Sequence, residues 1–162
     1  MKAIMYSTLA AVLALFAVVP TASTSEDSVV LEFERDARGA LLGSTIVFVR
    51  VKEGYKCKTS QGFLGQKKLA TLDKGNPLVS SKNASGVEAA PSDQFRILIR
   101  AIAGMQRCDV VASFAAKAGQ RYKLTARGDF PFNKDPICSA EVAVAQEGEF
   151  KKMEFEEYSQ CI

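Results

Sequence analysis

The sequence predicts an all-β protein, an antiparallel β-sandwich of seven or eight short strands. Apolar and polar residues alternate with a period of two in most of the chain, and Gly, Pro or Asn separates most of the alternating segments. Beyond residue 23 no window of a dozen residues carries an apolar stripe at helical spacing. Since no crossover helix is expected, the strands should pair antiparallel.

Each strand is predicted from its alternation or from its β-branched and aromatic residues. The first is typical, because Val29, Leu31 and Phe33 alternate with Glu32 and Glu34. In chain order the predicted strands lie at 29–34, 46–51, 95–100, 109–114, 122–126, 137–144 and 150–155, with 64–71 as a weaker eighth. The segment 73–94 is rich in Gly, Pro and Ser and is predicted to be a long loop, and a single helical turn is expected near 113–117.

The amino terminus has the pattern of an export signal. An apolar run from Leu9 to Val19 follows Lys2 and ends at Pro20-Thr21-Ala22-Ser23. This run is well short of the roughly 20 residues that span a bilayer, so no membrane span is expected. We therefore expect residues 1–23 to be removed and residues 24–162 to form one domain in the periplasm or outside the cell.

Charge and composition limit the classes of molecule that the protein is expected to bind. The chain has 21 basic and 18 acidic residues, a balance too even to favour a nucleic acid. With 48% hydrophobic and 24% charged residues, it should fold. We expect a monomer without cofactors that binds a protein or a glycan.

Four cysteines, Cys57, Cys108, Cys138 and Cys161, suggest two disulfides in an exported protein, and composition leaves all three pairings open. The chain has no histidine and no closely spaced cysteine pair, so neither a metal site nor a Cys-His nucleophile is expected. If 150–155 folds back along 137–144, Cys138 comes within reach of Cys161. This register favours the pairs Cys138–Cys161 and Cys57–Cys108.

One segment has a familiar order of elements. The turn Ala118-Gly119-Gln120 leads into a strand with Tyr122 and Leu124, and the strand starting Ile137-Cys138 follows after a loop. This order resembles the carboxy-terminal hairpin of small bacterial extracytoplasmic β-sandwich domains of unknown function. The resemblance covers residues 114–144, implies an immunoglobulin-like or transthyretin-like sandwich, and brings no activity with it.

The sharpest short motif is Arg127-Gly128-Asp129, followed by Phe130 and Phe132. It resembles the integrin-binding tripeptide, which needs a cation and a carboxylate held apart on an exposed turn. The simpler interpretation is that Gly128 and Asp129 only form the turn. These five residues are the candidate binding site of a loop predicted at 127–135.

Catalysis has weaker support. Glu32 and Glu34 share a strand face, as a carboxylate pair for acid and base chemistry would, and Asp129 is a further candidate. Without histidine no Ser-His site can form. A basic and aromatic patch is a further binding candidate, formed by Lys52, Tyr55, Lys56, Lys58, Phe63, Lys67 and Lys68.

The sequence thus favours a non-catalytic binding or structural module of the cell envelope or exterior. Two alternatives stay open. One is a secreted inhibitor or adhesion protein that uses the Arg127-Gly128-Asp129 loop, and the less favoured one is a carboxylate-dependent envelope hydrolase. An inhibitor should show a protruding rigid loop, and a hydrolase a concave pocket with two acidic groups.

Overall fold

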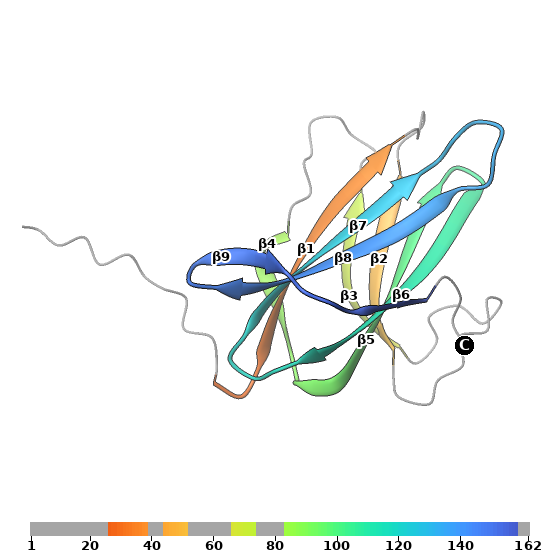
Figure 1. Ribbon diagram of the computed structural model, residues 1–162. Helices are drawn as coiled ribbons and strands as arrows, with labels where there is room; N and C mark the ends of the chain where they lie inside the picture. Colours follow the sequence, from red (N-terminus) through yellow and green to blue (C-terminus); the bar gives the residue numbers. More distant parts are fainter. Residues whose placement is uncertain (1–25, 39–43, 52–65, 74–82, 159–162) are drawn as a thin grey trace, which may run out of the picture.

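The computed structural model describes residues 26–38, 44–51, 66–73 and 83–158, which form two five-stranded sheets packed as a sandwich (Figure 1). The predicted all-β sandwich is confirmed, with ten strands in place of seven or eight. In chain order the strands are β1 (Val29–Arg38), β2 (Thr45–Val51), β3 (Lys67–Asp73), β4 (Asn83–Ala89), β5 (Ser92–Ala103), β6 (Gln106–Ala116), β7 (Arg121–Asp129), β8 (Ile137–Gln146), β9 (Glu149–Lys152) and β10 (Glu156–Tyr158).

Sheet A has the order β4-β1-β7-β8-β9, and sheet B has the order β10-β6-β5-β2-β3. Neighbouring strands pair antiparallel except β1 and β7, which are parallel over nine residue pairs from Val30↔Arg121 to Arg38↔Asp129. This pairing joins segments about 90 residues apart in the chain. No helix in the described ranges is long and apolar enough to cross a membrane.

The core lies between the sheets and is built from every second residue of the strands. Its largest fully buried side chains include Tyr122, Phe48 and Phe95. The ring centroids of Phe33 and Phe48 lie 4.5 Å apart, so an aromatic contact joins β1 of sheet A to β2 of sheet B. Removal of this apolar surface from water is the main force that holds the two sheets together.

The predicted turn before Tyr122 is confirmed. Gly119 has a φ of 73°, and the Gln120 backbone N–H donates to the Lys117 carbonyl at 3.3 Å. The buried Tyr122 hydroxyl accepts a 2.9 Å hydrogen bond from the Lys117 N–H and lies 2.6 Å from Gln120 Oε1. The phenol therefore ties the turn to the core while keeping its polar atom satisfied.

Two predictions for this part of the chain were wrong. The expected long loop at 73–94 contains β4, and β5 begins at Ser92. β4 is an edge strand of sheet A, so it needs few large apolar residues, and its alternation was too weak to recognise. The expected helical turn near 113–117 is instead the end of β6, whose Phe114 packs against Tyr122 at a centroid distance of 5.3 Å.

The carboxy-terminal strands fold back as predicted, but only in part. Glu147 and Gly148 have φ values of 53° and 88°, as the central residues of a type I′ hairpin turn do, and β9 pairs with β8. The Met153 N–H still donates to the Val142 carbonyl at 3.0 Å, and beyond Met153 the chain crosses to sheet B, where β10 pairs with β6. The pairing with β8 therefore ends before it reaches the residues that the cysteine prediction placed opposite Cys138.

Candidate functional site

Two loops meet at one end of the sandwich and form what we call the tip: the β5–β6 turn (Gly104-Met105) and the β7–β8 loop (130–136). Figure 1 shows both at the upper right, far from the β8–β9 hairpin at the left. The Gln106 side-chain amide donates to the Pro131 carbonyl at 3.0 Å and to the Lys134 carbonyl at 3.1 Å. One side chain of sheet B therefore clamps the loop of sheet A.

The β5–β6 turn is as short as a hairpin allows. Gly104 has a φ of 59° while Met105 has no positive φ, the pattern of a two-residue type II′ turn, and Ala103 pairs with Gln106 across it. A side chain at Gly104 would meet nothing within 4 Å, so the turn projects into solvent. Met105 at its end is fully exposed.

The two phenylalanines of the β7–β8 loop have opposite surroundings. Phe130 is 2% exposed and belongs to the core, whereas Phe132 is 86% exposed. A Cβ added to Gly128 would lie 2.8 Å from the Phe130 ring, so the glycine provides the space that this ring occupies. Of the two rings in the candidate binding site, Phe130 therefore belongs to the core and anchors the loop, and Phe132 is the one that reaches solvent. The neighbouring Ile137 is also largely exposed.

A disulfide between Cys108 of β6 and Cys138 of β8 joins the two sheets directly behind the tip, with a Cα–Cα distance of 5.8 Å. The predicted pairs Cys57–Cys108 and Cys138–Cys161 are therefore wrong, because β10 pairs with β6 and not with β8. Cys57 and Cys161 themselves lie outside the described residues. The bridge closes a separation of 30 residues, which corresponds to about 3.5 kcal/mol in the chain-entropy model.

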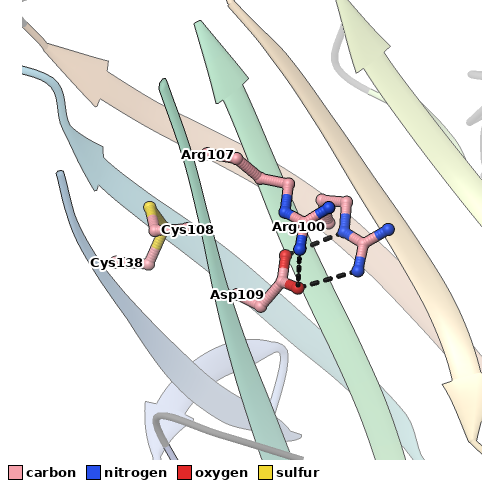
Figure 2. Close-up of polar contacts among 5 residues, drawn as sticks. All are labelled: Arg100, Arg107, Cys108, Asp109 and Cys138. Atoms are coloured by element: carbon pink, nitrogen blue, oxygen red, sulfur yellow. Dashed lines mark hydrogen bonds and ion pairs between the residues drawn. A yellow bond between two sulfur atoms is a disulfide. The ribbon is translucent and has the colours of Figure 1, made fainter. Parts of the chain in front are cut away.

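The opposite face of the same hairpin carries a charged cluster (Figure 2). Arg100 donates two hydrogen bonds to the Asp109 carboxylate, at 2.8 and 2.7 Å, and Arg107 Nη2 lies 3.8 Å from the same group. The hydrogen bond to Asp109 raises the pKa of the Arg100 guanidinium, against the lowering effect of partial burial. Arg100 and Asp109 are both mostly buried, so this bidentate pair fixes β5 against β6 just below the tip.

The Arg127-Gly128-Asp129 tripeptide lies inside β7, not in the loop where the sequence predicted it. β7 pairs with β1 on one side and β8 on the other, and its alternation places Arg127 and Asp129 on the exposed face of sheet A. Arg127 is engaged in ion pairs, at 3.0 Å to Glu141 and 3.8 Å to Asp36. The tripeptide is therefore extended, without the exposed turn that the adhesion motif requires.

These residues line a depression of about 350 Å³ on sheet A, next to the tip. Its lining consists of Asp36, Arg127, Gly128, Asp129, Ile137 and Ser139. Its charges are already paired in part, through Arg127 and Asp36. The depression offers a polar surface beside the apolar tip.

Of the three carboxylates considered for catalysis, Asp129 lines the depression beside the tip, and Glu32 and Glu34 have cationic partners. Glu32 pairs with Arg121, and Glu34 lies 2.5 Å from Lys123. With the Arg127 pairs they form a row of ion pairs across β1, β7 and β8. These contacts match the ordinary charged face of a sheet and leave neither Glu32 nor Glu34 without a partner.

A second depression, of about 440 Å³, lies where the chain crosses from sheet A to sheet B. Its lining includes three carboxylates, Asp93, Glu154 and Glu156, together with Gln94, Ser113, Phe114, Ala115 and Phe155. Glu157, which lies outside this lining, accepts a 2.9 Å hydrogen bond from the Ala140 N–H. No group of three or more acidic or cysteine residues in the described ranges is arranged to hold a metal ion.

Sequence reasoning missed Met105 and its clamp, Gln106. The signal was present: Gly104-Met105 separates two strand-like segments by exactly the two residues of a type II′ hairpin. Of the proposed basic patch, Lys67 and Lys68 lie on β3, an edge strand of sheet B. The other five members, Lys52, Tyr55, Lys56, Lys58 and Phe63, lie outside the described residues.

Comparison with known proteins gives little. No protein-family model matches the chain, and no curated protein matches its sequence. The structure is similar to that of a Bacteroides ovatus protein named "putative cell adhesion protein", with 15% identity and a TM-score of 0.32. The match covers 82% of this chain and 45% of that protein, so this chain spans less than half of its length. Nothing about function follows from a match of this size.

Proposed function

We propose that this protein is a non-catalytic binding module that works outside the cytosol, with the tip as its contact surface. The observation that carries the proposal is the full exposure of Met105 and the 86% exposure of Phe132 on two loops that are clamped together. Exposure of large apolar side chains to water is unfavourable, and a partner that covers them gains this free energy, so a group of them on a braced loop marks a contact surface.

The proposal includes the cellular location. A disulfide such as Cys108–Cys138 persists in oxidising compartments, and the apolar run at 9–19 supports export of residues 24–162 as one domain. The protein would reach the periplasm or the exterior as a monomer.

The candidate binding residues then take different roles. Phe132 contacts the partner directly, and Arg127 and Asp129 offer polar contacts from the neighbouring depression. Gly128 and Phe130 support the loop from the core side, because the ring of Phe130 fills the space next to the glycine and holds the loop in place.

The experiment compares three versions of the fluorescently labelled, exported protein for binding to surface material of its host. The native protein and Phe150→Ser, a control at the far end of the sandwich, should bind saturably with equal affinity. The double variant Met105→Ser/Phe132→Ser should bind at least tenfold more weakly. Equal binding by all three versions, or saturable binding by none, would contradict the proposal.

A carboxylate-dependent hydrolase is the second candidate, favoured by the depression that contains Asp93, Glu154 and Glu156. Its volume lies in the range of small-ligand sites. Hydrolysis of chromogenic glycosides or peptides by the native protein, lost in Glu154→Gln, would support it. Absence of turnover with both versions would remove it.

A further inference from the structure

We infer that the tip inserts into an apolar cleft of a folded protein partner, and not into a lipid bilayer, a glycan or a second copy of this chain. The inference rests on the proposed function and assigns the class of partner to the same surface. Three properties of the tip carry it: its rigidity, the chemistry of its outermost side chains and the balance of its charges.

Rigidity is the first property. The two-residue turn at Gly104-Met105, the paired hydrogen bonds of Gln106 and the Cys108–Cys138 bridge all fix the tip from behind. Phe130 fixes it from below. A rigid tip loses little conformational entropy when it enters a preformed cleft, so its rigidity increases the affinity for such a cleft. A fluid bilayer would accept flexible side chains equally well.

The outermost side chains are the second property. Phe132 and Ile137 offer no hydrogen-bonding groups and Met105 only a weakly accepting sulfur, so these side chains cannot satisfy the many hydroxyls of a glycan. An aromatic anchor that fills a pocket is typical of the energetic centre of protein interfaces, and methionine adapts to irregular apolar surfaces.

The charges around the tip are the third property. Within the tip Lys134 is matched by Asp135, and beside it Arg107 lies near Asp109 while Arg127 shares the neighbouring depression with Asp36 and Asp129. A tip that inserts into a bilayer usually gains from an excess of basic residues, which anionic headgroups attract, and this excess is absent here. Mixed charges around an apolar centre are typical of the polar rim of a protein interface.

The protein's own surface does not offer a matching receptor among the residues that the structure describes. The depression beside the tip combines Ile137 and Gly128 with Asp36, Arg127, Asp129 and Ser139, and the second depression combines Phe114, Ala115 and Phe155 with three carboxylates. Insertion of Met105 and Phe132 into either one would remove these carboxylates from water without giving them a new partner, a cost that opposes the apolar contact. Two convex tips facing each other would also leave most of their apolar surface wet. The required cleft must therefore belong to another protein.

The area of the tip sets the expected shape of the interface. Large side chains of this kind cover about 150–250 Å² each, so three give roughly 500 Å², short of the about 800 Å² per partner of a standard interface. The walls of the cleft must therefore also contact the flanks of the two loops, and the three apolar side chains should carry most of the affinity.

The experiment places a photoreactive side chain at the tip of the otherwise native, exported protein, as Phe132→benzoylphenylalanine, with Phe150→benzoylphenylalanine as the control. After irradiation with host surface material, position 132 should give one discrete protein adduct and position 150 none. A tenfold excess of unlabelled native protein should suppress this adduct at least fivefold, and the same excess of Met105→Ser/Phe132→Ser should not. Mapping of the crosslink should place it in an apolar concave site of the partner.

Parallel measurements separate the other occupants. The native protein should not co-sediment with vesicles of phosphatidylcholine or of phosphatidylcholine with phosphatidylserine, and it should sediment as a monomer. Protease treatment of the surface material should abolish the saturable binding. Tip-dependent binding that survives protease, or that occurs on vesicles or between copies, would overturn the inference and leave the proposed function standing. Binding that does not depend on the tip would overturn both.

Discussion

Phe130 and Phe132 are two residues apart and chemically identical, so substituting each tests the tip directly. Phe130 is 2% exposed in the core and Phe132 is 86% exposed. Phe130→Ala should lower the free energy of unfolding by about 3–5 kcal/mol, since it removes a buried ring and leaves a cavity. For Phe132→Ala, with only about a seventh of its surface covered, the same scaling gives about 0.5 kcal/mol.

The assay is urea unfolding followed by far-UV circular dichroism, with the disulfide intact and the slope of the transition compared between variants. A loss of about 4 kcal/mol would be a large share of the 5–15 kcal/mol typical of a domain, so Phe130→Ala should shift the midpoint clearly. In the binding assay the order should reverse, because Phe132 is the proposed contact. The reasoning fails if both alanine variants unfold at the same urea concentration.

Three further outcomes are expected. The double variant Cys108→Ala/Cys138→Ala should unfold with a free energy lower by about 3–4 kcal/mol, because it no longer closes a loop of about 30 residues in the unfolded chain. The same urea unfolding curves measure this loss, and an unchanged midpoint would contradict the bridge between the sheets. Gly128→Ala should cost about 1–3 kcal/mol, since its Cβ would collide with the Phe130 ring, whereas in the background of Phe130→Ala the cost should disappear. The hydrogen bond to Glu156 raises the pKa of Tyr158, so the pKa of this phenol is higher in the folded than in the unfolded protein. The contact therefore stabilises the fold below about pH 10, and this stabilisation is lost as the pH rises through the folded-state pKa. Spectrophotometric titration of the folded protein should show tyrosine ionisation above the usual pH range, and Tyr158→Phe should remove the part that the contact with Glu156 delays.

Strands could be predicted from the sequence where large apolar residues on the buried face alternate with residues on the other face of the strand. Val29 to Phe33 and Phe95 to Ile99 place every second residue in the core between the sheets, and Leu98 is also buried, in a separate cluster with Val47, Val49, Val51 and Val111. β4 was missed because an edge strand has one neighbour and needs fewer large apolar residues. Sequence periodicity reports burial, and it loses its signal where burial is slight.

The candidate site shows the same division. Phe130 and Phe132 were placed together in the candidate binding site, and nothing local distinguishes them, because they lie two residues apart in the same loop. Only the position of the core beneath Gly128 decides which ring is buried. Met105 was overlooked because the predicted strands ended at residue 100 and began again at residue 109, so the Gly104-Met105 hairpin signal fell in the gap between them.

By itself, the order of amino acids determined that this chain forms β-strands with one apolar face, that its cysteines fit an oxidising compartment, and that a tight turn precedes Tyr122. These properties depend on neighbours within a few residues. The tertiary structure alone decided the pairing of β1 with β7, the crossing of the chain after Met153, the Cys108–Cys138 bridge and the meeting of two loops at the tip. Each of these depends on which distant strands pack together, and that choice is made by the summed burial of the whole core, which no local pattern encodes.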